Sequence, residues 1–345
     1  MTPVLLTNRP TTLLVPAPIE DAPPMDTTRR DFITGVGAAA LAAAFLAACG
    51  SEDAESTPEA TEAPTRDVET PRGVVQVPRN PQRVVVMDRR GTLAYLRDLG
   101  VEPIAALSAP SIYGSTFHPL LTDVTGVTPL DSAEPDLEQV AALNPDLIVA
   151  HDTEGAFDGS IEQLKTIAPT VSYTFNFSRP DDALTDLGKI FGLEAKAAEL
   201  RAAFEADVAA AKVGLKSPGT VSLILPLADQ LRIYDARNLS GSIVKGLGGT
   251  VVPDIAPHVA TPGDDIAHVS YEQVNLVTGD TIVVFVNLSS DYEEIRQKLI
   301  SDPLFQQLPA VKAGRVIEVE SQANFGTAGL RGQRQVLDVL AKGLA

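Results

Sequence analysis

Arginine and tyrosine side chains end or follow two of the predicted strands, and they are the main candidates for binding chemistry. Arg89 follows the apolar run 84–87, and the run 231–234 ends at Tyr234 and is followed by Arg237. An arginine guanidinium keeps its charge, pairs with planar anions through a fork of donors, and stacks on aromatic rings. Because ligands of open α/β sheets bind beyond the carboxyl ends of strands, we expect Arg89 and Arg237 to clamp an anionic, aromatic-edged ligand.

Motifs for catalysis or metal binding are missing from the 345-residue sequence. It has no P-loop, no H-E-x-x-H and no G-x-S-x-G segment. One cysteine and four separated histidines (118, 151, 258 and 268) leave little material for a Cys- or His-built metal site. The net charge of −18 argues against nucleic-acid binding, and acidic pairs such as Asp264–Asp265 are typical of solvated surface in such a chain.

The first fifty residues carry export signals. Arg29 and Arg30 form a twin-arginine signature, and the charge-free run 33–48 is too short to span a bilayer well. The run ends in Leu46-Ala47-Ala48-Cys49, which resembles the lipobox of bacterial lipoproteins. We therefore expect export after folding, lipid attachment at Cys49, and location on the outer face of the cell membrane.

The body of the chain alternates apolar strands with amphipathic helices. Residues 1–48 are predicted to be the signal, with Met25 as an alternative start, and 49–72 to be a disordered acidic tether. Expected strands are 84–87, 104–107, 147–150, 171–175, 221–227, 231–234, 250–252, 282–286 and 315–319, and expected helices are 92–99, 137–143, 161–167, 240–247, 271–277 and 333–340.

This alternation predicts an α/β fold with parallel sheets and right-handed crossovers. The segment 182–217 is helical throughout, with a joint at Gly192, and separates an N-terminal lobe (73–181) from a C-terminal lobe (218–345). We therefore predict two Rossmann-like lobes joined by a single long helix. The lobes show no convincing sequence repeat.

Three stretches of the body carry a family resemblance. They are 81–86 with 99–103, the run 137–149 that contains Asn144-Pro145-Asp146, and 311–316. These stretches resemble the substrate-binding lipoproteins of ATP-binding-cassette (ABC) importers for iron–siderophore complexes, a group that includes cobalamin and haem binders. The resemblance implies a monomeric binding protein without enzyme activity or cofactor. Its partners are a ferric siderophore, a permease dimer and the ATPase of that permease.

The resemblance also implies where the ligand and the permease bind. The ligand lies in a shallow cleft between lobes that move little, and a glutamate on each lobe docks the permease. Glu138 and Glu272 match that role, and we expect them on the same outer face, far from the cleft. The predicted ligand contacts are Arg89, Tyr113, Tyr234, Arg237, His258, Phe325 and Arg331. A siderophore supplies its own iron ligands, so protein metal ligands are not required, although His258 could complete an unsaturated iron.

Three alternatives stay open at this stage. The ligand of the same kind of receptor is cobalamin or haem, the protein is an exported α/β enzyme such as a tethered hydrolase, or it captures zinc or manganese directly. The missing nucleophile motif disfavours the hydrolase, and the four separated histidines disfavour direct metal capture. The chain has no tryptophan, so tyrosine or phenylalanine must supply any aromatic contact.

Overall fold

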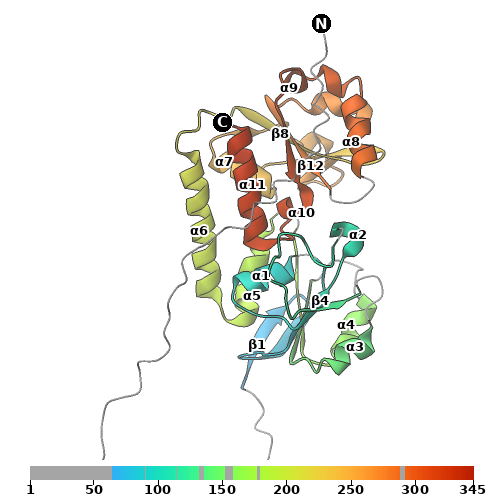
Figure 1. Cartoon of the computed structure of the whole chain (residues 1–345), viewed down its shortest axis with the longest axis vertical. Helices are drawn as coiled ribbons and strands as arrows, with labels where there is room; N and C mark the ends of the chain where they lie inside the picture. The colour runs from blue at the N-terminus through green and yellow to red at the C-terminus, as the bar shows by residue number, and fades with distance from the viewer. Residues whose placement is uncertain are drawn as a thin grey trace, which may run out of the picture. The chain divides into compact units, whose positions relative to one another are not determined.

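The computed structural model describes residues 64–345 except Arg90, Gly114, 132–135, 152–157, 177–178 and 288–291. It contains two α/β lobes with a pair of consecutive helices between them (Figure 1). Cys49, Arg29 and Arg30 lie outside the described residues. Within the described part of the chain, no helix is both long enough and apolar enough to cross a membrane.

The N-terminal lobe is built on a parallel sheet in the order β5-β4-β3-β6-β7. Its elements are β1 (Thr65–Thr70), β2 (Gly73–Pro78), β3 (Val84–Val86), α1 (Thr92–Asp98), β4 (Ala105–Leu107), α2 (Pro110–Tyr113), β5 (Thr128–Leu130), α3 (Leu137–Ala142), β6 (Leu147–His151), α4 (Asp158–Leu164) and β7 (Thr170–Tyr173). Every residue of β3 and β4 is buried, as expected of strands covered on both faces.

Strand β1 lies inside the segment predicted to be a disordered tether, so that boundary was wrong for its last residues. β1 pairs antiparallel with β2, and Val68 and Val77 are buried in the main core. The guanidinium of Arg66 donates to the carbonyl oxygens of Lys189 and Ile190, near the end of the helix Asp181–Phe191. These contacts are long-range, and a single valine among polar residues gives no strand signal by itself.

The helical segment 182–217 consists of α5 (Asp181–Phe191) and α6 (Glu194–Lys212). Gly192 ends α5 in the left-handed region at φ 68°, which confirms the predicted joint. One hydrophobic core cluster contains residues of both lobes and of these helices. α6 and the C-terminal helix α11 (Gly329–Gly343) are in contact and lie side by side (Figure 1).

The C-terminal lobe has a mixed sheet in the order β11-β9-β8-β12-β13, with β10 also paired to β8. The elements of this lobe before α11 are β8 (Thr220–Pro226), β9 (Gln230–Tyr234), α7 (Leu239–Gly246), β10 (Thr250–Val251), η1 (Ala256–His258), β11 (Ile266–Ser270), η2 (Tyr271–Leu276), β12 (Thr281–Val286), α8 (Tyr292–Ser301), η3 (Phe305–Gln307), α9 (Pro309–Lys312), β13 (Val316–Glu320) and α10 (Ser321–Asn324).

The sheet of this lobe is mixed, which the alternation of strands and helices does not reveal. β9 pairs antiparallel with β8, and β11 pairs antiparallel with β9. The connection 227–229 is too short for the crossover that a parallel pair needs. Tyr234 therefore lies opposite Leu223 in the middle of β8, and Arg237 follows a strand end that points away from the carboxyl end of β8.

In both lobes an aspartate side chain accepts hydrogen bonds at the start of a core strand, which the sequence alone did not reveal. The Asp146 carboxylate accepts hydrogen bonds from the backbone N–H groups of Gln82 and Arg83 at 2.6 and 2.8 Å. Asp280 accepts from the N–H and hydroxyl of Thr220 at 3.1 and 2.7 Å. Each aspartate thus fixes the chain at the entry of the first parallel strand of its lobe, β3 or β8.

Candidate functional site between the lobes

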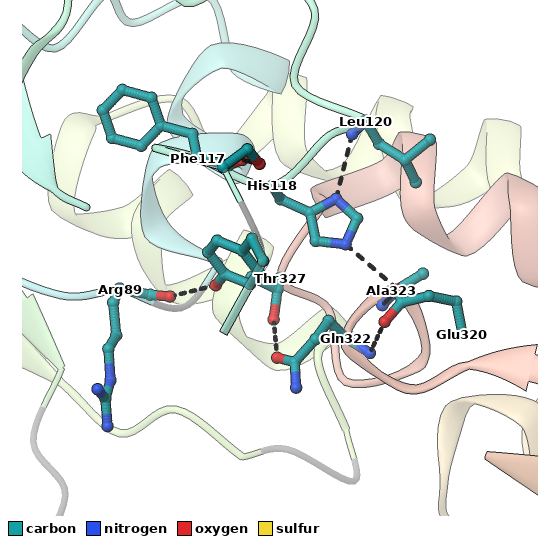
Figure 2. Close-up of polar contacts among 10 residues, drawn as sticks. Arg89, Phe117, His118, Leu120, Glu320, Gln322, Ala323 and Thr327 are labelled. Atoms are coloured by element: carbon teal, nitrogen blue, oxygen red, sulfur yellow. Dashed lines mark hydrogen bonds and ion pairs between the residues drawn. The ribbon is translucent and has the colours of Figure 1, made fainter. Parts of the chain in front are cut away.

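The segments after β3 and β4 approach each other at the side chain of Tyr113. Tyr113 is buried, and its hydroxyl donates a hydrogen bond of 2.5 Å to the backbone carbonyl of Arg89. The Arg89 side chain is exposed and points away from His118 and Glu320, which are described next (Figure 2). Its guanidinium has no hydrogen-bond or ion-pair partner among the described residues. The backbone of Arg89 is therefore held by Tyr113, whereas its guanidinium makes no contact of this kind with the described residues.

His118 links the N-terminal lobe to the C-terminal lobe. The backbone N–H of Leu120 donates to His118 Nδ1 at 3.2 Å, so the neutral ring carries its proton on Nε2. Nε2 lies 3.2 Å from an Oε2 of Glu320, the last residue of β13, and both side chains are buried. The ring of Tyr113 packs edge-on against His118 at 5.3 Å between centroids. The pair therefore holds the two lobes together at one end of the site (Figure 2).

Glu320 is held by the short helix that follows it. Its carboxylate accepts from the backbone N–H groups of Gln322 and Ala323 at 2.8 and 2.6 Å, which makes it the N-cap of α10. Further along, the Thr327 hydroxyl lies 3.2 Å from the Gln322 side-chain oxygen (Figure 2). These bonds place Thr327 opposite the N-terminal lobe.

A small pocket of about 10 Å³, roughly the room that one water molecule needs, lies among these groups. Residues of both lobes line it, and they are Asp88, Arg89, Leu93, Leu107, Tyr113, Phe117, His118, Leu121 and Thr327. The lining thus includes Asp88 and Arg89 together with aromatic, aliphatic and hydroxyl groups. The mixture of apolar walls and few polar groups is that of small-molecule sites, but the pocket is much smaller than the roughly 300–1,000 Å³ that such sites have.

Tyr234 and Phe325, two predicted ligand contacts, pack together in the C-terminal lobe. The Tyr234 ring lies 5.3 Å from Phe285 and 5.7 Å from Phe325, measured between centroids. Tyr234 is buried, and this burial raises the pKa of its hydroxyl to about 12, so it is protonated at neutral pH. Phe325 is only partly buried and covers the outer side of this aromatic cluster.

Arg237 and Arg331 differ from Arg89, because their guanidinium groups are already bound. Arg237 donates to the Asp235 carboxylate at 2.7 Å and to the carbonyl oxygens of Gly263 and Asp264 at 2.8 and 2.7 Å. Arg331 donates to the Leu120 carbonyl and the Thr122 hydroxyl at 2.9 and 2.6 Å. Arg237 thus connects the loop after β9 to the loop before β11 within one lobe. Arg331 instead connects the C-terminal lobe to residues 120–122 of the N-terminal lobe.

His258, the residue considered for iron, lies in η1 and is partly exposed. Among the residues that the structure describes, no group of three or more His, Cys, Asp or Glu side chains could hold a metal ion. His258 therefore has no companion ligands there.

Glu138 and Glu272 occupy equivalent places in the two lobes. Each is exposed in the first turn of a helical segment, α3 or η2. Two residues later, Val140 and Val274 are both fully buried. The shared Glu-Gln-Val pattern thus anchors each segment through its valine and leaves its glutamate in solvent.

The sequence analysis missed His118 and Glu320, which join the lobes, and Gln322 and Thr327, which hydrogen-bond to each other next to them. Glu320 ends a parallel strand, so the rule for carboxyl ends would have pointed to it. His118 lies in a loop with no strand or helix signal, and nothing in its neighbours marks it. Only the fold brings it to Glu320, 202 residues later in the chain.

A comparison with known families settles the class of this protein. The sequence signature of the periplasmic binding protein family matches residues 91–323. The chain belongs to the periplasmic binding protein family. Members of this family are binding proteins.

Relatives within the periplasmic binding protein family cover most of the chain. The probable siderophore-binding lipoprotein YfiY of Bacillus subtilis is 28% identical over 308 residues, which is 86% of this chain and 93% of the relative. The iron(3+)-hydroxamate-binding protein FhuD of the same organism is also 28% identical, over 82% of this chain and 88% of its own length. The resemblance to siderophore-binding lipoproteins is therefore confirmed.

Solved structures confirm the two-lobed α/β fold. Staphylococcus aureus SirA complexed with staphyloferrin B superposes with a TM-score of 0.64 at 26% identity, covering 81% of this chain and 97% of SirA. A FhuD fold-family protein from Bacillus subtilis gives a TM-score of 0.64 at 25% identity, covering 80% of this chain and 99% of its own.

Proposed function

We propose that this protein is a lipid-anchored receptor that captures a ferric siderophore and delivers it to an ABC importer. The observation that carries the proposal is the junction of the lobes, where Arg89, Tyr113, Phe117 and Thr327 line one small pocket and the Arg89 side chain is exposed. The proposal is also supported by relatives named for binding siderophores and iron(3+)-hydroxamates.

Arg89 is the strongest candidate for a direct ligand contact. Its backbone is fixed by Tyr113, while its guanidinium is exposed. A guanidinium donates charge-assisted hydrogen bonds to the negatively polarised oxygens that surround a chelated iron. Phe117, which is partly buried, lines the same pocket and supplies aromatic surface. The siderophore provides the ligands to iron, so the protein needs only to recognise the outside of the complex.

The lobes are proposed to close only slightly on the ligand before the permease is engaged. The His118–Glu320 contact and the Arg331 hydrogen bonds already tie the lobes together. A large hinge motion would break the buried His118–Glu320 contact and the exposed hydrogen bonds of Arg331. Delivery is then proposed to depend on docking of Glu138 and Glu272 onto basic permease residues, powered by the ATPase of the importer.

Anchoring is proposed to occur through lipid on Cys49 after export directed by Arg29 and Arg30. The sequence from Arg29 to Cys49 has the order of such a signal. Replacing Cys49 with Ala should release the protein from membranes. Intact mass measurements that find unmodified Cys49 together with residues 25–48 would contradict this part of the proposal.

Native mass spectrometry of the protein offered ferric siderophores, haem and cobalamin tests the main proposal. We expect a one-to-one complex with at least one ferric siderophore. Arg89→Gln should weaken that complex about tenfold or more, the loss of one charge-assisted hydrogen bond. Lys216→Gln removes the same charge from an exposed position after α6 and should leave affinity unchanged. Binding of haem or cobalamin alone, or turnover in a hydrolase screen, would overturn the proposal.

A further inference from the structure

We propose that Tyr113 is a positioning residue of the ligand site, which acts on the ligand through Arg89 rather than by touching it. The inference rests on the proposed function and concerns the same site. Tyr113 is only 7% exposed, so a ligand at the junction of the lobes can reach little of its side chain. Its hydroxyl instead donates a hydrogen bond of 2.5 Å to the backbone carbonyl of Arg89.

Arg89 depends on this hydrogen bond because its neighbours in the chain are held by other contacts. The N–H of Met87 donates to a carbonyl of the neighbouring strand β6 at 2.8 Å. Gly91 packs so closely on the C-terminal lobe that a Cβ there would lie 2.5 Å from the Gly326 carbonyl oxygen. Among the described residues, the Tyr113 hydroxyl is the one hydrogen-bond partner of Arg89. Removing it frees the peptide group that follows the Arg89 Cα, and with it the direction of the side chain.

The Tyr113 side chain is itself held in place. Its backbone N–H donates to the Ala109 carbonyl at 3.0 Å, and its ring packs edge-on against His118 at 5.3 Å between centroids. His118 is in turn bound to Glu320 of the C-terminal lobe. A hydroxyl on a ring held in this way stays within reach of the Arg89 carbonyl. The hydrogen bond therefore orders the Arg89 backbone before any ligand arrives.

Order of this kind affects affinity. A side chain that is mobile in the free protein must lose conformational freedom on binding, and that loss weakens the complex. A backbone that is already fixed removes part of this cost. One neutral hydrogen bond corresponds to about a two- to tenfold change in an equilibrium constant, which sets the size of the expected effect.

Hydrogen–deuterium exchange of the ligand-free protein tests the ordering directly. Tyr113→Phe keeps the buried ring and removes only the hydroxyl. Amides in a peptide covering residues 88–93 should exchange about two- to tenfold faster in this variant. Tyr271→Phe is the matched control, because the Tyr271 hydroxyl also donates to a backbone carbonyl, that of Leu227, at 2.8 Å. It should leave exchange of residues 88–93 unchanged. Equal exchange of this peptide in the wild type and in Tyr113→Phe would overturn the inference.

Calorimetric titration measures the effect on binding, with ferrichrome and ferric enterobactin as probes together with any other ferric siderophore that native mass spectrometry detects. Tyr113→Phe should weaken each complex that forms about two- to tenfold. In the Arg89→Gln protein the guanidinium is already gone, so Tyr113→Phe should cause no further loss. Tyr271→Phe should leave affinity unchanged in both proteins. A general loss of structure would not depend on the Arg89 guanidinium in this way.

The outcomes separate this inference from the proposed function. Equal losses from Tyr113→Phe with and without the Arg89 guanidinium would mean that Tyr113 touches the ligand or acts independently of Arg89. That result, or an unchanged affinity in Tyr113→Phe, would overturn the inference and leave the siderophore receptor intact. Binding of haem or cobalamin alone would overturn the proposed function itself. The exchange measurement needs no ligand, so it would still decide whether Tyr113 orders the Arg89 backbone.

Discussion

The His118 ring donates its Nε2 proton to the Glu320 carboxylate at 3.2 Å, and this buried contact joins the two lobes. The donor is fixed because Nδ1 accepts from the Leu120 N–H. Glu320 also caps α10, so one carboxylate serves both the lobe contact and the turn that follows β13. Buried hydrogen bonds to a charged group contribute more to stability than exposed ones.

We predict that His118 and Glu320 are energetically coupled. In a double-mutant cycle with His118→Ala and Glu320→Ala, the coupling in the free energy of unfolding should be about 1–3 kcal/mol. The cycle cancels the separate loss of the α10 cap, which occurs in Glu320→Ala with or without His118. Urea denaturation of the four proteins gives the value. Strict additivity of the two single losses would show that the contact contributes nothing.

The sequence predicted the elements of this fold far better than the contacts between them. Long apolar runs such as Val84–Val86 and the helical stripe around Phe204 identified strands and helices, because burial imposes their periodicity. β9 was identified as a strand, but its direction depends on a three-residue turn, and pattern alone does not give direction. Arg89 and Arg237 look alike in sequence. They are distinguished only by their partners: among the described residues the Arg89 guanidinium has none, whereas that of Arg237 binds Asp235, Gly263 and Asp264.

Gly326 is predicted to be required for the close packing of the lobes. Its φ is +80°, and a Cβ there would lie 2.3 Å from the Cβ of Pro180 and 2.8 Å from the Tyr95 hydroxyl. Gly100 has a similar φ of +86° with no atom within 4 Å of the added Cβ. Gly100→Ala should therefore lose only the backbone preference, about 1–2 kcal/mol. Gly326→Ala should lose a further 1–3 kcal/mol, roughly, from overpacking. Equal losses in urea denaturation would refute the steric argument.

Asp98 should give the protein a component of stability that decreases as pH rises. Its carboxylate accepts from the Leu330 N–H at 2.9 Å, and burial raises its pKa above the ordinary value despite this bond and the nearby Arg334. The folded protein therefore holds this proton to higher pH than the unfolded chain does. The stabilising contribution is full below the unfolded pKa and is lost as pH rises through the folded one.

Asp98→Asn removes this titration and keeps an oxygen acceptor for Leu330. The free energy of unfolding of the wild type minus that of the variant should fall as pH rises from about 3.9, the ordinary pKa of an unfolded aspartate, through the raised pKa of the folded protein. Glu199→Gln, which removes an exposed carboxylate of α6, controls for the loss of one charge. A wild-type-minus-variant difference that rises over this range would mean that hydrogen bonding outweighs burial at Asp98.

The last prediction concerns docking to the permease. Glu138 and Glu272 are exposed one residue inside their helical segments, while Val140 and Val274 hold those segments to the lobes. A glutamate in a first turn also stabilises its helix through the dipole, by a few tenths of a kcal/mol up to about 1 kcal/mol. Docking and local stability are thus the two roles to separate.

Reversing both residues, Glu138→Arg with Glu272→Arg, places positive charge where the permease is expected to present arginines. Uptake of the iron complex by cells should be abolished, whereas ligand affinity, measured by quenching of tyrosine fluorescence, should not change. The control reverses one exposed glutamate in each lobe elsewhere, Glu162→Arg with Glu294→Arg, and should leave uptake near normal. Both double variants change the net charge by the same amount, so a difference in uptake between them shows that the positions of the glutamates matter. If affinity falls together with uptake, these glutamates act in the ligand site or in folding, and the docking role is wrong.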